Sequence, residues 1–248
     1  MKENFIEHPL EGRGKLTYKW LPNNINKLLD VGCAYGYYTK FYLNKCKRVY
    51  GIDPNEDFIR IAKEKYPKIK FKVSNAESIP YKDNYFGVVL LNDVLEHVEN
   101  EEKALSEIYR ILKKEGVIIL TVPNKGLLWF MDVDNYSWYV RTYFPKLYIL
   151  FNKVRRKEIK IKPGYANKHK HYSIKNIEKL FEGKFKIEKF IRRGLFDMVV
   201  CNIELLVRIL FGEKICNKAK IILDRINYFD YNFNYGKLSG ALVVFGRK

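Results

Sequence analysis

The sequence predicts a protein of the α/β class, with a mostly parallel sheet and helices on both of its faces. Three observations support this prediction. Over about the first 125 residues, short apolar runs alternate with amphipathic stretches of helical period, which is typical of repeated strand–helix–strand units. Several of these apolar runs are continuous, as expected of strands covered on both faces. With 248 residues, 47% of them hydrophobic, the chain is long enough to bury one sizeable core.

The elements of this first part follow from their apolar runs and end signals. Strands are expected over 27–32, 48–53, 69–74, 86–92 and 117–122. Helices are expected over 36–45, from Pro54 to Tyr66 and from Glu99 to Lys114. Pro54 fits a first helical turn, where its missing N–H costs little, and Gly116 is placed to end the last of these helices.

The pattern changes after Asn124. Residues 127–151 are rich in aromatic side chains, and residues 153–170 carry eight Lys and Arg against one Glu. Regular elements then resume: a helix capped by Ser173, a strand over 185–191, a broadly apolar helix over 196–211 and a last strand over 240–245.

Positive charge is concentrated in the second half of the chain. The formal net charge is +18, and residues 126–248 hold 25 Lys and Arg against 11 Asp and Glu. Such a field favours anionic partners, namely nucleic acid, acidic lipid headgroups or phosphorylated substrates. Part of it is equally explained by genome composition or heat adaptation, because Lys is abundant throughout.

Cysteine spacing and hydropathy indicate a cytoplasmic protein. The four cysteines form no CxxC pair, so neither a disulfide scaffold nor a zinc site is indicated, and no metal is expected. The N-terminal residues lack the apolar core of a secretory signal, and no uncharged apolar stretch approaches the length needed to span a bilayer. Contact with a membrane surface is left open by the wide apolar face of residues 196–211.

A glycine-containing turn carries the clearest chemical signal. The first strand ends in Leu29-Asp30-Val31-Gly32-Cys33-Ala34-Tyr35-Gly36, and Asp53 ends the next strand. Glycine lets the backbone approach a ligand closely, and a carboxylate at the position of Asp53 can accept two ribose hydroxyls. A dinucleotide fingerprint is not matched, because Ala34 and Tyr37 stand where it requires its second and third glycines.

This turn, together with four further segments, resembles the class I S-adenosylmethionine-dependent methyltransferases. The further segments are the acidic end of the second strand, Asn75-Ala76-Glu77-Ser78-Ile79-Pro80-Tyr81, Asn92-Asp93-Val94-Leu95-Glu96-His97-Val98, and Arg110 to Gly116 followed by Val122-Pro123-Asn124. The resemblance implies a Rossmann-like, doubly wound sheet of seven strands with an antiparallel last strand. It also implies S-adenosyl-L-methionine as cofactor and one domain, with a cofactor-binding half (1–124), an inserted lid (125–172) and a substrate-side part (173–248).

The resemblance assigns roles residue by residue. Gly32, Ala34 and Gly36 would border the methionine part of the cofactor, with Asp30 near its amino group. Asp53 would hold the ribose, Asn75 and Ala76 would address the adenine edge, and the backbone of Asn92 would meet the aminoacyl end. The chain departs from the family at Ala34, at Asn75, where an acid is usual, and at Gly87, where an Asp is usual.

Two histidines are candidates for a catalytic base. His97 follows the fourth strand at the carboxyl end of the sheet, where open α/β folds bind ligands, and His171 resembles a histidine common at that place in the family. Each also has a purely structural interpretation, in which it bonds the backbone at the start of a helix.

The function expected from these features is methyl transfer to an oxygen of a small-molecule, lipid or glycan acceptor, anionic or amphipathic in character. An RNA methyltransferase is the first alternative, because the second half is basic, although no RNA-binding module is recognised. A non-catalytic protein that binds the cofactor is the other, because Asn75 and Gly87 depart from the family. The sequence does not indicate an oligomeric state.

Overall fold

The computed structural model describes residue 10, residues 12–146 and residues 170–248. They group into two compact units. The sheet unit comprises Met1–Val122, Ile174–Ile191 and Val243–Lys248, and the helical unit comprises Pro123–Ser173 and Arg192–Leu242. Most of the basic stretch predicted over 153–170 lies outside the described residues.

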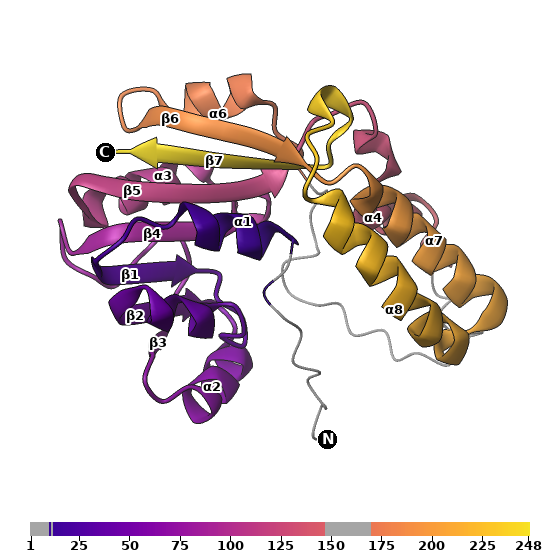
Figure 1. Ribbon diagram of the computed structural model, residues 1–248, viewed down its shortest axis with the longest axis horizontal. Coiled ribbons are helices and arrows are strands. Elements are labelled where there is room, and N and C mark those ends of the chain that lie inside the picture. Colours follow the sequence, from indigo (N-terminus) through magenta and orange to yellow (C-terminus); the bar gives the residue numbers. More distant parts are fainter. Residues whose placement is uncertain (1–9, 11, 147–169) are drawn as a thin grey trace. The chain divides into compact units, whose positions relative to one another are not determined.

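The sheet has seven strands in the order β3-β2-β1-β4-β5-β7-β6. Their bounds are β1 (Ile25–Val31), β2 (Cys46–Asp53), β3 (Lys70–Val73), β4 (Phe86–Asn92), β5 (Leu112–Pro123), β6 (Lys186–Arg193) and β7 (Ala241–Arg247). Strands β1 to β5 pair in parallel, and Figure 1 shows β7 running opposite to its neighbours β5 and β6. The predicted α/β fold with an antiparallel last strand is confirmed.

Helices and short 3₁₀ turns connect the strands. The α-helices are α1 (Gly12–Trp20), α2 (Glu56–Lys65), α3 (Glu101–Ile111), α4 (Val133–Tyr143), α6 (Ile174–Phe181), α7 (Phe196–Phe211) and α8 (Glu213–Asp230). The 3₁₀ turns are η1 (Thr39–Asn44), η2 (Leu95–His97), η3 (Trp129–Met131) and η4 (Gly236–Leu238). In Figure 1, α1 lies in front of the sheet and α3 behind it. Within the described part of the chain, no helix combines the length and the apolar character that crossing a membrane requires.

The core of the sheet unit follows from the two-residue period of its strands. Leu28, Leu90 and Ile119 point to one face of the sheet, where they belong to one apolar cluster with residues of α2 and with Leu16 of α1. Their sequence neighbours point to the other face and are equally buried, so the central strands are covered on both sides. This double coverage explains why their sequences are continuously apolar.

Helices α2 and α3 of the sheet unit begin at asparagine caps. The Asn55 side chain accepts a hydrogen bond from the backbone N–H of Phe58, and Asn100 accepts one from Lys103. Both satisfy N–H groups that a helix start leaves without a partner inside the helix. Pro54 therefore precedes the cap of α2. The prediction that Pro54 lies in the first turn of this helix is wrong.

Two predicted element boundaries are wrong. Residues 36–45 form a turn and the 3₁₀ helix η1, because this stretch is rich in aromatic residues, which are poor helix formers. Gly116 does not end α3, because α3 ends at Ile111 and β5 already starts at Leu112. The residue with a left-handed backbone in this stretch is Glu115, whose φ is +60°. Helix α7 and the strands β4, β6 and β7 lie close to their predicted positions, whereas α1, α4 and α8 were not predicted.

Candidate cofactor site at the carboxyl end of the sheet

The carboxyl ends of β1 and β2 bring two carboxylates to the same edge of the sheet. Asp30 is paired in register with Gly51, two residues before Asp53. Asp30 is buried and accepts a hydrogen bond of 2.6 Å from the Thr39 hydroxyl. Desolvation raises the pKa of Asp30 to about 7, since the hydrogen bond from Thr39 offsets only part of it and the nearby charge of Asp53 adds to it.

Asp53 is held by backbone donors from both sides. One carboxylate oxygen accepts the N–H of Ala34 at 2.9 Å, and the other accepts the N–H of Asn55 at 2.9 Å. Burial raises the pKa of Asp53, while these two hydrogen bonds lower it. Each carboxylate oxygen has a second lone pair for a ligand hydroxyl, so the geometry suits the predicted ribose-binding role.

The turn between β1 and η1 needs a glycine at position 32. Gly32, Ala34 and Gly36 all have positive φ values, +71°, +45° and +74°. At Gly32 the requirement is also steric, because a Cβ atom there would lie 2.4 Å from a methyl group of Val94. The N–H groups of Gly32 and Cys33 both donate to the carbonyl of Ile52, which ties the turn to β2. The alanine that departs from the family pattern therefore occupies a left-handed position and donates to Asp53.

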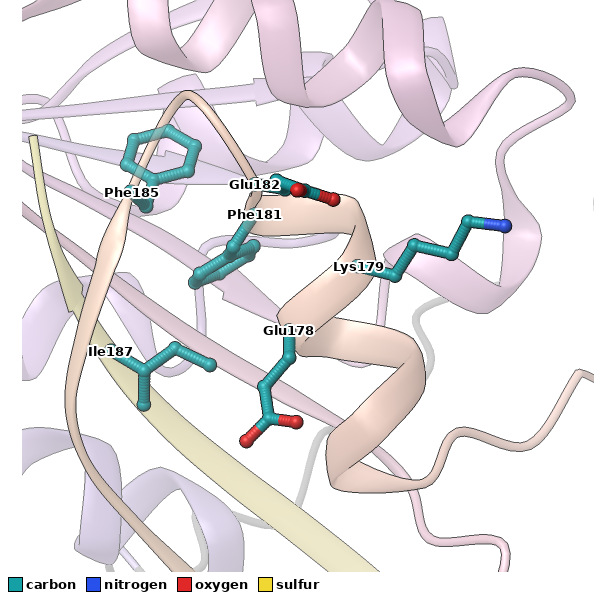
Figure 2. Close-up of a pocket in the computed structure, with 6 residues that line it drawn as sticks. All are labelled: Glu178, Lys179, Phe181, Glu182, Phe185 and Ile187. Atoms are coloured by element: carbon teal, nitrogen blue, oxygen red, sulfur yellow. The ribbon is translucent and has the colours of Figure 1, made fainter.

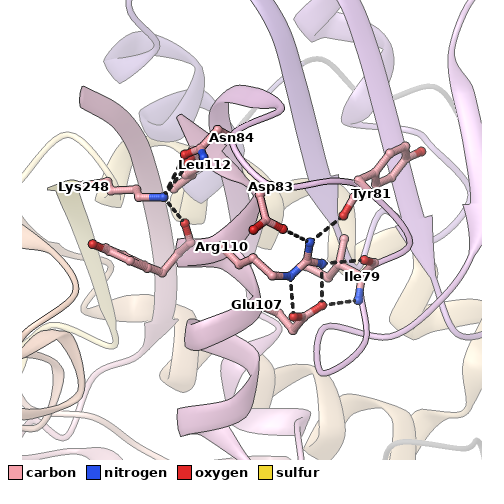
Figure 3. A network of polar contacts seen from close by, with 9 residues as sticks. Ile79, Tyr81, Asp83, Asn84, Glu107, Arg110, Leu112 and Lys248 are labelled. Carbon is pink, nitrogen blue, oxygen red and sulfur yellow. Dashed lines mark hydrogen bonds and ion pairs between the residues drawn. The ribbon is translucent and has the colours of Figure 1, made fainter. Parts of the chain in front are cut away.

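The segment after β3 is positioned by a polar network on α3 (Figure 3). Arg110 donates to the carbonyls of Ile79 and Tyr81 and pairs with Asp83 at 2.7 Å, and Glu107 accepts the N–H of Ile79. A guanidinium suits this task because it offers several donors in a rigid plane. The Arg110 segment, which the sequence analysis noted as a motif, thus holds the loop that carries the predicted adenine-side residues.

The two adenine-side residues differ in exposure. Asn75 is exposed and its side-chain oxygen accepts the N–H of Glu77 at 3.1 Å, whereas Ala76 is buried. The backbone of Ser74 donates to the carbonyl of Asp53, so this loop starts next to the ribose-side carboxylate.

Helix α1 supplies polar side chains that the sequence analysis missed. Thr17, fully buried, donates to the Asn92 side chain at 2.8 Å, and Asn92 donates to the Tyr42 hydroxyl at 3.2 Å. Arg13 forms an ion pair with Asp93, whose carboxylate also accepts from the Thr121 hydroxyl. Helix α1 therefore binds the end of β4 through side chains. Its sequence carries two glycines and no clear apolar stripe, so no local signal pointed to it.

The two predicted bases have different surroundings. His97 ends η2 and is exposed. His171 belongs to the helical unit, and its side chain is only 4% exposed. Its Nε2 atom lies 3.1 Å from a carboxylate oxygen of Asp132, and its ring meets that of Trp129 edge to face. Asp132 is a partner that the sequence did not indicate, because 39 residues separate the two positions.

A cavity of about 360 Å³ lies elsewhere, between α6 and β6 (Figure 2). Its lining residues are Glu178, Lys179, Phe181, Glu182, Phe185 and Ile187. None of the predicted cofactor residues contributes to it, so we do not assign the cofactor there.

The residues at the carboxyl edge fit an adenosyl ligand. Asp53 presents carboxylate oxygens suited to vicinal hydroxyls, and the turn around Gly32 brings backbone close to the same edge without a side chain. Asp30 lies on β1 next to this turn, buried and hydrogen-bonded by Thr39. Asp30, Gly32, Ala34, Gly36, Asp53 and Asn92 thus lie together at the ends of neighbouring strands, as predicted.

Comparison with known proteins shows what part of the sheet unit is similar to. Residues 29–120 match the family model described as a methyltransferase domain. A protein of Mycolicibacterium smegmatis named "Probable S-adenosylmethionine-dependent methyltransferase" is 29% identical over 98 residues, which are 40% of this chain and 38% of that protein. An uncharacterized protein of Methanocaldococcus jannaschii is 41% identical over 133 residues, 53% of this chain and 56% of that protein. The chain thus matches between about two fifths and somewhat over half of the length of these relatives.

The fold agrees with the sequence match. A solved structure of an S-adenosylmethionine-dependent methyltransferase from Methanosarcina mazei superimposes with a TM-score of 0.55 at 19% identity, covering 94% of this chain and 96% of that one. Residues 29–120 are thus similar to methyltransferase domains, and the seven-stranded sheet has the fold of a solved S-adenosylmethionine-dependent methyltransferase.

Proposed function

We propose that this protein transfers a methyl group from S-adenosylmethionine to an oxygen atom of a small-molecule, lipid or glycan acceptor. The observation that carries the methyl-transfer part is the pairing of Asp53 with the backbone of the Gly32–Gly36 turn at the carboxyl edge of the sheet. The cofactor, when bound, supplies an electrophilic methyl group on a sulfonium. The protein's tasks are then to align the acceptor, to exclude water and to handle the acceptor's proton.

The pairing of His171 with Asp132 favours oxygen as the accepting atom. A hydroxyl is a poor nucleophile until it loses its proton, so its methylation benefits from a general base. The carboxylate of Asp132 lies 3.1 Å from Nε2 of His171, so a histidine with an acidic neighbour is available for this task. In the proposed reaction His171 would accept the proton of the acceptor hydroxyl, and the cofactor, when bound, would supply the methyl group.

Cofactor binding is tested by calorimetric titration of S-adenosylmethionine and of its demethylated product. Asp53→Ala removes the predicted ribose acceptor and should weaken binding by about 10- to 100-fold, the loss expected for hydrogen bonds to a charged group. Asp57→Ala, an exposed acid on α2 with a side chain 81% exposed, is the matched control and should bind like the wild type. Absence of binding to the unmodified protein would overturn the proposal.

The acceptor is tested with radiolabelled methyl donor on lysate separated into lipid, glycan, small-molecule, protein and RNA fractions. We expect label in the lipid, glycan or small-molecule fraction, and mass spectrometry should locate it on oxygen. Label confined to RNA or protein, or located on nitrogen or carbon, would contradict the proposed acceptor.

The proposed base is tested on the acceptor so identified. His171→Asn should lower kcat by about 100-fold or more while cofactor affinity is unchanged, and the remaining activity should rise with pH. Asp132→Asn should have a smaller effect of the same kind, and His97→Asn measures the contribution of the other histidine. A wild-type kcat in His171→Asn would remove His171 from the mechanism.

A further inference from the structure

Helices α7 and α8 of the helical unit form a hairpin with an apolar end. Gly212, at φ +80°, separates the helices, and its N–H donates to the carbonyl of Arg208. Cys216 is fully buried with its Sγ 3.5 Å from the carbonyl of Glu204, and Lys220 lies 3.9 Å from the Glu204 carboxylate. Contacts across the two helices thus hold them side by side, as Figure 1 shows.

The end of this hairpin exposes large apolar side chains. We call residues 206–218 the hairpin tip. Leu206, Leu210, Phe211 and Ile215 are 56%, 69%, 60% and 49% exposed, although leucine, isoleucine and phenylalanine are among the residue types most often buried. Single exposed residues of this kind need no explanation, but four of them within ten residues form a patch typical of an interaction surface.

Basic residues accompany the apolar ones. The hairpin tip contains Arg208, Lys214 and Lys218 against Glu213 alone. Lys218 stands three residues after Ile215 and four before Ile222, so the three share one face of α8. Ile222 and, seven residues later, Phe229 continue this face, and both are 64% exposed. Apolar side chains interspersed with Lys and Arg are the composition of helices that lie in the surface of a membrane with acidic lipids.

We propose that the hairpin tip docks on an anionic lipid surface, with its apolar side chains among the lipid chains and the exposed Lys218 near the acidic headgroups. Charge complementarity selects this occupant over a second copy of the chain. A two-fold contact would bring the same positively charged tip against itself, whereas acidic lipids attract it.

The proposal is tested by flotation of the full chain with vesicles, without any methyl donor. One set of vesicles contains phosphatidylcholine alone, and the other contains equal parts of phosphatidylcholine and phosphatidylglycerol. We expect the protein to float with the mixed vesicles, to bind the neutral ones far less and to lose binding at high salt. Because the assay needs no cofactor, its failure is distinct from failure of the proposed methyl transfer.

Two variants locate the contact. Leu210→Ser with Phe211→Ser should reduce the partition coefficient on mixed vesicles by about tenfold or more, because two large apolar side chains are lost. Leu127→Ser is the matched control, since Leu127 is 61% exposed in the same unit but lies outside the hairpin. All three replaced side chains are exposed, so the unfolding midpoints should stay near that of the wild type.

Three results would overturn the proposal. They are failure of the wild type to float with the mixed vesicles, equal binding by the tip variant, and a stable dimer in light scattering that the tip variant converts to monomers. The last result would assign the tip to a second copy of the chain.

Discussion

The sheet unit and the helical unit differ in how much of their apolar side-chain surface is exposed. Among the described residues, four large apolar side chains are conspicuously exposed in the sheet unit and fifteen in the helical unit. The central strands β1, β4 and β5 of the sheet unit are almost completely buried. The sheet unit therefore satisfies its hydrophobic surface internally, whereas the helical unit presents much of it outward.

This difference indicates which unit is shaped mainly by internal packing and which one presents surface for recognition. A buried strand must fit its neighbours, so its sequence reflects packing, whereas an exposed apolar surface persists where something is recognised. The residues predicted to bind the cofactor lie in the sheet unit, whose buried strands hold the turn around Gly32 and the carboxylates of Asp30 and Asp53. The more open unit is the place to look for acceptor and membrane recognition.

The sharpest test of the comparison is to shorten one leucine in each unit. Leu90→Ala removes a fully buried side chain of β4 and should lower the free energy of unfolding by about 3–5 kcal/mol, because a cavity is left in a core that cannot collapse. Leu210→Ala, at a side chain 69% exposed, should change it by less than about 0.5 kcal/mol. Urea unfolding followed by circular dichroism measures both. Similar losses in the two variants would mean that the tip is buried in solution.

A second test uses the pH dependence of the buried Asp30. Burial raises its pKa to about 7 in the folded protein from an ordinary value of 3.8, so between these pH values the folded state keeps a proton that the unfolded chain has lost. The contribution of Asp30 to stability is therefore fully present below pH 3.8 and is lost as the pH rises to about 7. Asp30→Asn cannot titrate. Relative to the wild type, its free energy of unfolding should rise by about 3 kcal/mol between pH 4 and pH 7.5.

Urea titrations at a series of pH values measure this difference. A gap between variant and wild type that stays constant over the whole range would show that Asp30 is already ionised at low pH in the folded protein.

A smaller effect separates two glycines with the same backbone conformation. Gly32→Ala must adopt a φ of +71° and also places a Cβ 2.4 Å from Val94, whereas Gly183→Ala adopts a similar φ of +69° with no atom within 4 Å. In both variants the left-handed conformation should lower the free energy of unfolding by about 1 kcal/mol. In Gly32→Ala overpacking should lower it by about 1–2 kcal/mol more. Thermal unfolding of the two variants provides the comparison. Equal destabilisation would indicate that Val94 moves aside without cost.

The sheet unit was largely predictable because its signals are local. The continuous apolar run of β4, the stripe of α3 and the acidic residues ending β1 and β2 all depend on residues close together in sequence. Errors arose where a boundary depends on packing, as at Gly116, which lies inside β5. Helix α1 was missed because its hydrogen bonds and ion pairs reach residues more than 70 positions away.

The sequence by itself determined the fold class and the succession of the main strands along the chain, because two- and 3.6-residue periods are properties of short segments. The residues predicted to bind the cofactor likewise came from strand-end motifs, and their role stays a prediction. The tertiary structure decided which groups meet: Thr39 with Asp30, Thr17 with Asn92, and Asp132 with His171. It also decided which apolar residues remain exposed at the end of the α7–α8 hairpin. These outcomes depend on how segments distant in sequence pack together. The apolar period within one segment does not predict such contacts.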